Sequence, residues 1–152
     1  MTVAEDGGDV LQHYRASRQR LLAAIDGLTD AQMSEQTIDG WSVKDHLAHL
    51  AFWDDMRAAE VERISAGHDA AWKMTDEQDD AHNAMGYELR RSMSPAQARW
   101  ELDTSRRKLL DAIAGASPRA LDQSRYGAAP LRSDHEDAHA GWIERWRGEN
   151  GF

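Results

Sequence analysis

Two histidines near the end of the chain, His135 and His139, have the spacing of a metal-binding pair. Residues four apart lie on the same side of an α-helix, so both imidazoles can reach one ion. The same five residues spell H-E-x-x-H, the signature of zinc metalloproteases, in which the glutamate activates water. The two interpretations make different demands. A protease needs Glu136 beside the ion, whereas a site inside a helical bundle needs a ligand from another helix.

A helical wheel separates these interpretations. At about 100° per residue, both histidines fall on the apolar stripe and face a bundle core, while Glu136 turns away from the stripe. We therefore expect Glu136 at the surface. Only thirteen residues follow His139 and none is histidine, so the protease interpretation lacks a convincing third ligand. A pair of ordinary hydrogen-bonded histidines at the core remains the alternative to a metal. The apolar residues that define the stripe are Leu131, Ala138, Trp142 and Trp146.

Composition narrows the class of protein. A length of 152 residues predicts a single domain over 1–152, and the absence of cysteine excludes disulfides and thiolate metal sites. The net charge of −9 argues against nucleic acid or an anionic membrane as partner. No apolar run reaches the roughly 18 residues of a membrane span, and residues 1–8 do not resemble a signal peptide. We expect a cytoplasmic protein, and the excess of arginine over lysine suggests a bacterial source.

The helices expected from apolar spacing and end signals form an all-α four-helix bundle with one additional short helix. Ser42 and the Ser94-Pro95 pair are the clearest helix starts. We expect the helix over 10–25 to serve only to pack the core. We expect Trp100, in the helix over 95–114, to be buried. The expected helical ranges are 10–25, 43–65, about 76–91, 95–114 and about 135–148.

A second pair of histidines strengthens the metal interpretation. His46 and His49 lie on the flank of the 43–65 helix, beside Trp53 and Met56. Histidines that project inward from facing helices are a common way to build a metal site in a bundle core. His13 and His68 are expected at the surface.

The segment around this second pair resembles a known family. Residues 40–53 are similar to the second-helix motif of the DinB-like superfamily, W-[ST]-V-x-D-x-x-x-H, which falls here on Trp41, Asp45 and His49. The nearest branch is the mycothiol-dependent maleylpyruvate isomerase N-terminal type. A late H-x-x-x-H falls on His135 and His139, and the first helix with its exit at 28–33 also fits.

The resemblance implies a three-histidine site for a divalent metal. Carried over by position, the ligands are His49, His135 and His139, with His46 as the alternative to His49. Zinc is expected, with nickel or iron as alternatives, and no catalytic residue is expected beyond the ligands. The substrate pocket predicted from helix facing and from the family comprises Trp53, His82, Tyr87 and Trp142.

The resemblance also implies an activity. We expect an enzyme, a thiol-dependent S-transferase or isomerase or a hydrolase, whose metal activates mycothiol or water against a small electrophile. Detoxification or self-resistance to a natural product would be its setting. The alternative is a binding protein that sequesters a hydrophobic small molecule without turnover. A dimeric scaffold with a vestigial site is a third interpretation, and a homodimer is also considered for the enzyme.

Overall fold

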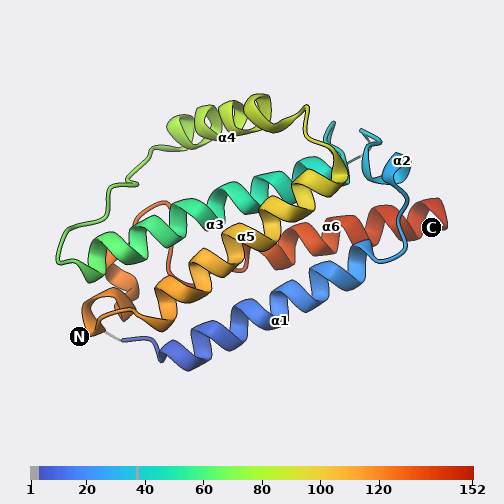
Figure 1. The fold of residues 1–152 in the computed structure, drawn as a ribbon. Coiled ribbons are helices and arrows are strands. Elements are labelled where there is room, and N and C mark those ends of the chain that lie inside the picture. The colour runs from blue at the N-terminus through green and yellow to red at the C-terminus, as the bar shows by residue number, and fades with distance from the viewer. Residues whose placement is uncertain (1–3, 37) are drawn as a thin grey trace.

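Helices dominate this computed structural model, which describes residues 4–36 and 38–152. Four long helices, α1, α3, α5 and α6, lie side by side as a bundle, and the shorter helix α4 lies outside it (Figure 1). The α-helices are α1 (Gly7–Ile25), α2 (Asp30–Met33), α3 (Val43–Ser65), α4 (Asp76–Arg90), α5 (Pro95–Ala114) and α6 (His135–Asn150). Two short 3₁₀ turns, η1 (Pro118–Leu121) and η2 (Gln123–Arg125), lie between α5 and α6. The predicted four-helix bundle with one additional short helix is confirmed, and α2 adds a single turn.

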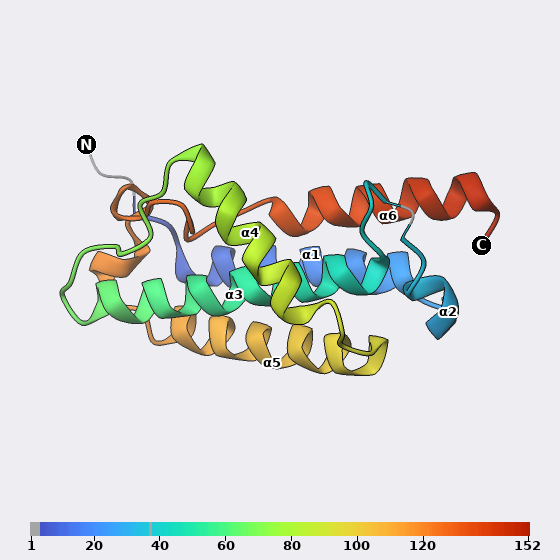
Figure 2. The ribbon, with the colours of Figure 1, turned by 90° about the horizontal axis from the view of Figure 1, so that it is seen from above.

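The pairing of the helices determines which faces meet. Helix α3 packs most extensively against α5, and α1 packs against α6. Figure 2 shows α4 crossing diagonally over α3. No helix in the described part of the chain combines the length and apolar character needed to cross a bilayer.

The sequence signals for helix starts operate as expected. Ser42 caps α3 through a reciprocal capping box with Asp45, and Thr75 caps α4 in the same way with Gln78. Ser94 caps α5, with Pro95 at its first position. Each cap supplies an acceptor for amide groups that have no partner inside the helix, which fixes where the helix begins.

A polar layer lies between the two largest of the three apolar clusters in the described core. One apolar cluster lies at the end that contains Leu21, Leu47 and Ile143, and the other lies at the end that contains Tyr14, Val61 and Leu109. Between them, every long helix contributes buried polar side chains, which are Ser17, Arg18, His46, Asp54, Arg57, Ser105, Arg106, Glu136 and His139. Buried polar groups are costly unless they are paired, so this layer is the place to look for function.

Helix α4 packs closely against the Phe52 ring of α3. His82 stacks on Phe52 at 4.6 Å between ring centroids, and the guanidinium carbon of Arg90 lies 4.6 Å from the same ring. Gly86 sits between them, where a Cβ atom would come within 2.9 Å of the Phe52 ring. Glycine inside a helix costs about 1 kcal/mol relative to alanine, and here it permits α4 to approach α3 closely.

Trp100 corrects one expectation about the core. Its side chain is 63 % exposed rather than buried. The reason is its position on α5, about 160° around the helix from Leu102 and about 180° from Leu109, which are both fully buried.

Candidate metal site

Three histidine nitrogens converge between α3 and α6. His49 Nε2 lies 3.1 Å from His135 Nε2, which in turn lies 3.0 Å from His139 Nε2. One ring nitrogen from each of the three side chains falls within 4.8 Å of the other two. The structure thus brings together the three residues that the sequence predicted as metal ligands, and their role as ligands stays a prediction.

The spacing of these nitrogens fits a small divalent ion. Ligand nitrogens about 2.0–2.1 Å from a tetrahedral zinc ion lie roughly 3.3 Å from one another. Hydrogen bonds alone cannot pair all three nitrogens, because a neutral imidazole has a single N–H donor and a single acceptor. His135 Nε2 is close to two other Nε2 atoms and can form a hydrogen bond with only one of them.

Burial keeps these imidazoles neutral. It lowers the pKa of His135 to about 4 and that of His49 to about 3. Burial also lowers the pKa of His139, and the neighbouring histidines lower it further. A neutral imidazole has a free lone pair, which is the form that binds a metal.

His46 lies behind the three convergent nitrogens. Its Nδ1 atom is 2.7 Å from Nδ1 of His139, and its ring is 3 % exposed. When His139 donates its Nδ1–H to His46, the Nε2 lone pair of His139 is left free for a ligand. Such contacts fix the tautomer and orientation of a metal-binding histidine. His46 is therefore placed to position His139, whereas His49 occupies the place in the trio.

The other motif residues in this segment support the same histidines. The Trp41 ring packs edge-on against His49, with centroids 5.1 Å apart, and lies nearly parallel to the ring of Tyr87. Asp45 accepts hydrogen bonds from the backbone amide and the hydroxyl of Ser42, which fixes the first turn of α3. The motif therefore sets both the start of the helix and the environment of its histidines.

Glu136 contradicts the expectation that it lies at the surface. Its side chain is 4 % exposed, and both carboxylate oxygens accept hydrogen bonds from arginines. Arg18 Nη2 lies 3.0 Å and Arg106 Nη2 lies 2.8 Å from its Oε1 atom. The apolar stripe of α6 did not reveal this, because the partners come from α1 and α5. Glu136 is engaged away from the histidines, which removes the support for a zinc protease.

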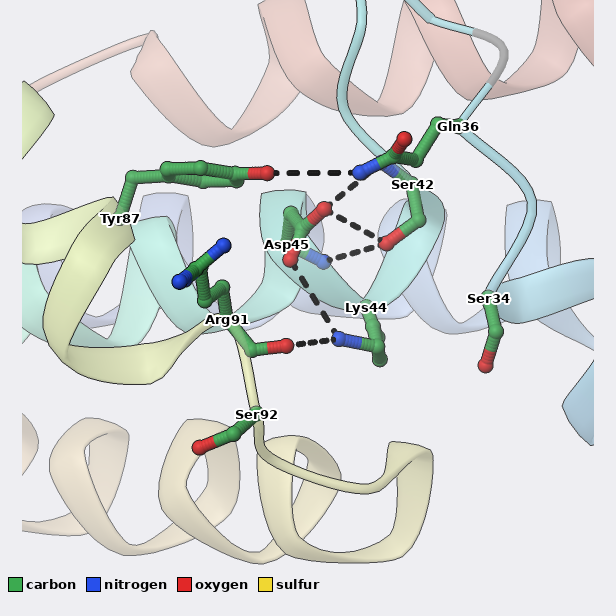
Figure 3. A pocket seen from close by; sticks show the side chains of 8 residues that line it. All are labelled: Ser34, Gln36, Ser42, Lys44, Asp45, Tyr87, Arg91 and Ser92. Atoms are coloured by element: carbon green, nitrogen blue, oxygen red, sulfur yellow. Dashed lines mark hydrogen bonds and ion pairs between the residues drawn. The ribbon is translucent and has the colours of Figure 1, made fainter.

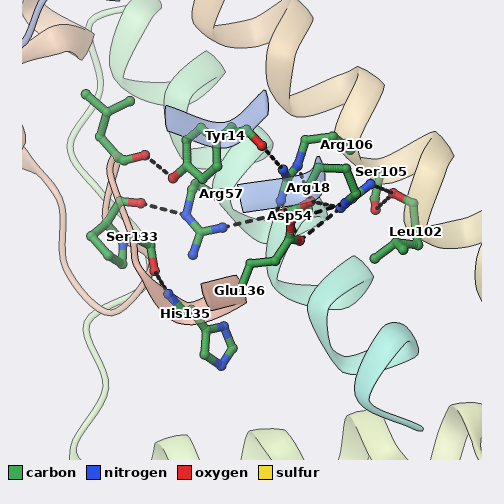
Figure 4. Close-up of polar contacts among 12 residues, drawn as sticks. Tyr14, Arg18, Asp54, Arg57, Leu102, Ser105, Arg106, Ser133, His135 and Glu136 are labelled. Atoms are coloured by element: carbon green, nitrogen blue, oxygen red, sulfur yellow. Dashed lines mark hydrogen bonds and ion pairs between the residues drawn. The ribbon is translucent and has the colours of Figure 1, made fainter. Parts of the chain in front are cut away.

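Glu136 belongs to a larger network of buried charges (Figure 4). Asp54 accepts hydrogen bonds from Arg106 Nε at 2.8 Å and from Arg57 Nη1 at 3.2 Å. Burial alone would lower the pKa of Arg106, but Asp54 and Glu136 outweigh burial and raise it. We call this the charge network; its members are Arg18, Asp54, Arg57, Arg106 and Glu136. We call His46, His49, His135 and His139 the histidine cluster.

The sequence contained a signal for the charge network that the packing interpretation of the first helix missed. Arg18 lies four residues after Tyr14 and three before Leu21, so it is on the buried face of α1. Arg106 has the same relation to Leu102 and Leu109 on α5. A charged residue in register with an apolar stripe indicates a buried ion pair.

A cavity of about 280 Å³ borders the histidine cluster. It lies between α3, α4, the segment before α6 and the first residue of α6. Trp53, predicted to line a substrate pocket, is in its wall, and Trp53 Nε1 donates to Asn83 Oδ1 at 2.9 Å. His135 forms another part of the wall, so the cavity reaches one of the three convergent histidines.

A second cavity of about 320 Å³ lies beside the start of α3 (Figure 3). Its lining is polar and includes Tyr87, Lys44 and Asp45. Lys44 Nζ donates to the Arg91 carbonyl and pairs with Asp45, so the lining is already tied together. Tyr87 also borders a small cavity of about 10 Å³ next to His49.

The remaining histidines and Trp142 are placed as follows. His82, on α4, packs against Phe52 and Trp53 of α3. Trp142 lies edge-on to His139, with centroids 4.6 Å apart. Trp142 is 40 % exposed. His68 is exposed as expected, but the His13 side chain is only 13 % exposed, which corrects its surface assignment. The cause is the Ser133 carbonyl, 2.7 Å from His13 Nε2.

Solved structures with the same fold include three very different proteins. An uncharacterised protein from Escherichia coli UTI89 matches with a TM-score of 0.78 and 14 % identity, over 99 % of this chain and 97 % of that one. The sibling lethal factor precursor DfsB matches with a TM-score of 0.75 and 13 % identity, over 95 % and 96 %. The mycothiol-dependent maleylpyruvate isomerase matches with a TM-score of 0.64 and 16 % identity, over 91 % of this chain but 57 % of that one. At these identities the likeness concerns the fold.

A family model provides the assignment. The model of the DinB superfamily matches residues 13–144, which include both histidine pairs and all four long helices in whole or in part. No curated protein matches the chain. The chain belongs to the DinB superfamily.

Proposed function

We propose that this protein is a metal-dependent enzyme in which His49, His135 and His139 hold one divalent ion. Zinc is the first candidate and nickel or iron the alternatives. The observation that carries the proposal is the convergence of three neutral Nε2 atoms beside a cavity. When bound, the ion would leave a position open and lower the pKa of a thiol or water molecule there, which yields a nucleophile near neutral pH.

The chain's own residues contribute orientation and exclusion of water. His46 holds the His139 ring through their Nδ1 atoms, and Trp41 and Trp142 cover the rings of the cluster. Buried surroundings strengthen any electrostatic interaction in the site. The chemistry is attack of the nucleophile on a small electrophile, as in an S-transferase, isomerase or hydrolase.

A low-molecular-weight thiol is the proposed co-substrate, with mycothiol as the first candidate. Support comes from membership of the DinB superfamily and from the similarity in fold to the mycothiol-dependent maleylpyruvate isomerase. This chain spans just over half of that protein, so its whole activity is not transferred. A role in detoxification or self-resistance follows from the same proposal, because electrophiles are the compounds that thiol transfer removes.

Metal analysis combined with an activity assay tests the proposal. Purified protein, its metal-stripped form, H139A and the exposed control H68A are analysed for bound zinc, nickel and iron. Each is then assayed for conjugation of mycothiol to monobromobimane. We expect about one ion per chain and catalysis in the native protein and H68A, and neither in H139A.

Two other outcomes discriminate the alternatives. A metal-free protein whose tryptophan fluorescence is quenched by hydrophobic compounds, unchanged in H139A, would replace the enzyme with a sequestering protein. A bound ion without conjugation, but with hydrolysis of a bimane ester, would make water the nucleophile.

A further inference from the structure

Arg57 is the member of the charge network that faces the cavity beside His135. Its side chain is 4 % exposed, and it forms part of the cavity wall together with Trp53 and His135. Arg57 also acts electrostatically on His135, since it is one of the groups that lower the pKa of that imidazole after burial. The guanidinium therefore lies between the charge network and the histidine cluster.

The hydrogen bonds of Arg57 leave one nitrogen unused. Nε donates to the Pro130 carbonyl at 2.7 Å and Nη1 to Asp54 at 3.2 Å. Nη2, which carries two N–H donors, has no acceptor among the residues that the structure describes. In Figure 4 two of the three Arg57 nitrogens have dashed contacts and the third has none. The side chain as a whole is nearly buried, so this free nitrogen is held in place and can donate to a ligand in the cavity.

The ion pairs around Arg57 are compatible with an anion in the cavity. The three buried arginines and two buried carboxylates of the network are joined by Asp103, a half-exposed carboxylate 3.9 Å from Arg18. Asp54 is the carboxylate that pairs with Arg57 itself, and it contacts Nη1, so Nη2 stays free to donate to an anion. Guanidinium groups bind carboxylates and phosphates through directed N–H donors.

The rest of the cavity favours a carboxylate over a phosphate. Asp79 on α4 lines the same space, so a second negative charge on the ligand would be repelled. Trp53, Ala128 and Pro130 supply apolar surface for the body of the molecule. Asn83 already accepts from Trp53, which leaves its amide N–H groups as donors toward the cavity.

We infer that the cavity binds a small monocarboxylate with an apolar body, whose carboxylate is held by Nη2 of Arg57. Resting on the proposed function, this inference makes the carboxylate part of the electrophilic substrate and places it next to the metal site. Arg57 is then the residue that binds the carboxylate, and Asp79 disfavours a second negative charge on the substrate.

Equilibrium dialysis of radiolabelled benzoate tests the inference, with benzamide as its uncharged match. Metal-stripped native protein should bind benzoate at least tenfold more tightly than benzamide. R57Q should lose at least a factor of ten in benzoate affinity while its benzamide affinity is unchanged. The control R20Q, which removes a half-exposed arginine paired with Glu144, should bind both compounds as the native protein does.

The arms of the experiment separate this inference from the proposed function. Equal binding of benzoate and benzamide, or benzoate binding that a folded R57Q retains, would overturn the inference, whatever the metal content. If R57Q does not fold, the comparison of the two ligands on native protein decides alone. Because the measurement uses metal-stripped protein, a failure of the protein to bind zinc would not affect the test of the carboxylate inference. Zinc binding without an Arg57-dependent preference for benzoate would contradict only the carboxylate inference and leave the proposed metal site standing.

Discussion

The charge network and the histidine cluster are adjacent, but their hydrogen bonds are satisfied in different ways. They meet at His135 and Glu136, consecutive residues of α6. In the charge network, both oxygens of Asp54 and of Glu136 accept hydrogen bonds from arginines on other turns and helices. In the histidine cluster, Nε2 of His135 lies 3.1 Å from Nε2 of His49 and 3.0 Å from Nε2 of His139. The first arrangement is nearly complete, whereas in the second His135 Nε2 has two close nitrogen neighbours and can form a hydrogen bond with only one of them.

The two groups therefore have different structural roles within one polar layer. The charge network connects α1, α3, α5 and α6. Its directed hydrogen bonds specify how these four helices are rotated against one another more narrowly than apolar packing alone does. The histidine cluster uses only α3 and α6, so a change there leaves most helix contacts intact. Arg57 belongs to the first group and faces the cavity of the second.

The largest expected effect comes from breaking the charge network. Asp54→Asn takes the carboxylate partner from Arg57 and leaves Arg18 and Arg106 with Glu136. Removing one partner of a buried pair costs about 3–5 kcal/mol. We expect the free energy of unfolding, measured by urea titration of the metal-free protein, to fall by that amount. A loss below about 1 kcal/mol would mean that the network contributes little to holding the helices.

A smaller effect is expected from the residue behind the metal site. His46→Phe keeps a buried ring but removes the partner of His139 Nδ1, and loss of such a partner typically weakens metal binding about 10–100-fold. Competition with a zinc chelator measures the affinity. Unchanged zinc affinity would show that His46 only fills space. Complete loss of zinc binding would show that His46, and not His49, is the third metal ligand.

The pH dependence of stability distinguishes the two regions further. In the unfolded chain a histidine gains its proton near pH 6.5, whereas burial lowers the pKa of His46 and His135 to about 4 and of His49 to about 3. Between pH 6.5 and 5 the unfolded state therefore binds more protons, so stability is lost as the pH falls. The slope is about 1.4 kcal/mol per pH unit for each such proton.

Urea titrations of metal-free protein at pH 7, 6 and 5 measure this slope. The double variant H46Q/H139Q, which removes two of the titrating imidazoles, should have a shallower slope than native protein. A stability that stays constant from pH 7 to 5 would contradict the neutral, buried state of the cluster.

The smallest effect is expected from an ion pair outside the polar layer. Arg20 donates two hydrogen bonds to Glu144, at 2.9 and 3.2 Å. The guanidinium of Arg20 lowers the pKa of Glu144, and the Glu144 carboxylate raises the pKa of Arg20. Both side chains are more than 40 % exposed. Pairs of this kind contribute about 0–1 kcal/mol, so Glu144→Ala should change the urea midpoint far less than Asp54→Asn. An equal effect would remove the contrast between buried and exposed pairs.

The features that local sequence determines were the ones that could be predicted. Ser42, Thr75 and Ser94 mark helix starts through short-range caps, and the four-residue spacing of His135 and His139 places both on one side of α6. The trio with His49 was available through the family resemblance. Its geometry, with Nε2 atoms about 3 Å apart, needed the packing of α3 against α6.

The charge network could not be assembled from local patterns. Arg18, Asp54, Arg106 and Glu136 come from four helices, and each alone looks like a solvated charge. The wheel placed Glu136 off the apolar stripe of α6, which was right about its direction and wrong about its exposure. The second side of α6 is covered by arginines from α1 and α5, and a count of apolar residues does not register them.

The central claim is that His49, His135 and His139 bind one divalent ion. Isothermal titration of zinc into metal-stripped protein tests it most directly, with the triple variant H49A/H135A/H139A and the exposed control H68A beside the native chain. We predict one site per chain in native protein and H68A, and no specific site in the triple variant. Native stoichiometry and affinity in a folded triple variant, or no binding by the native chain, would contradict it.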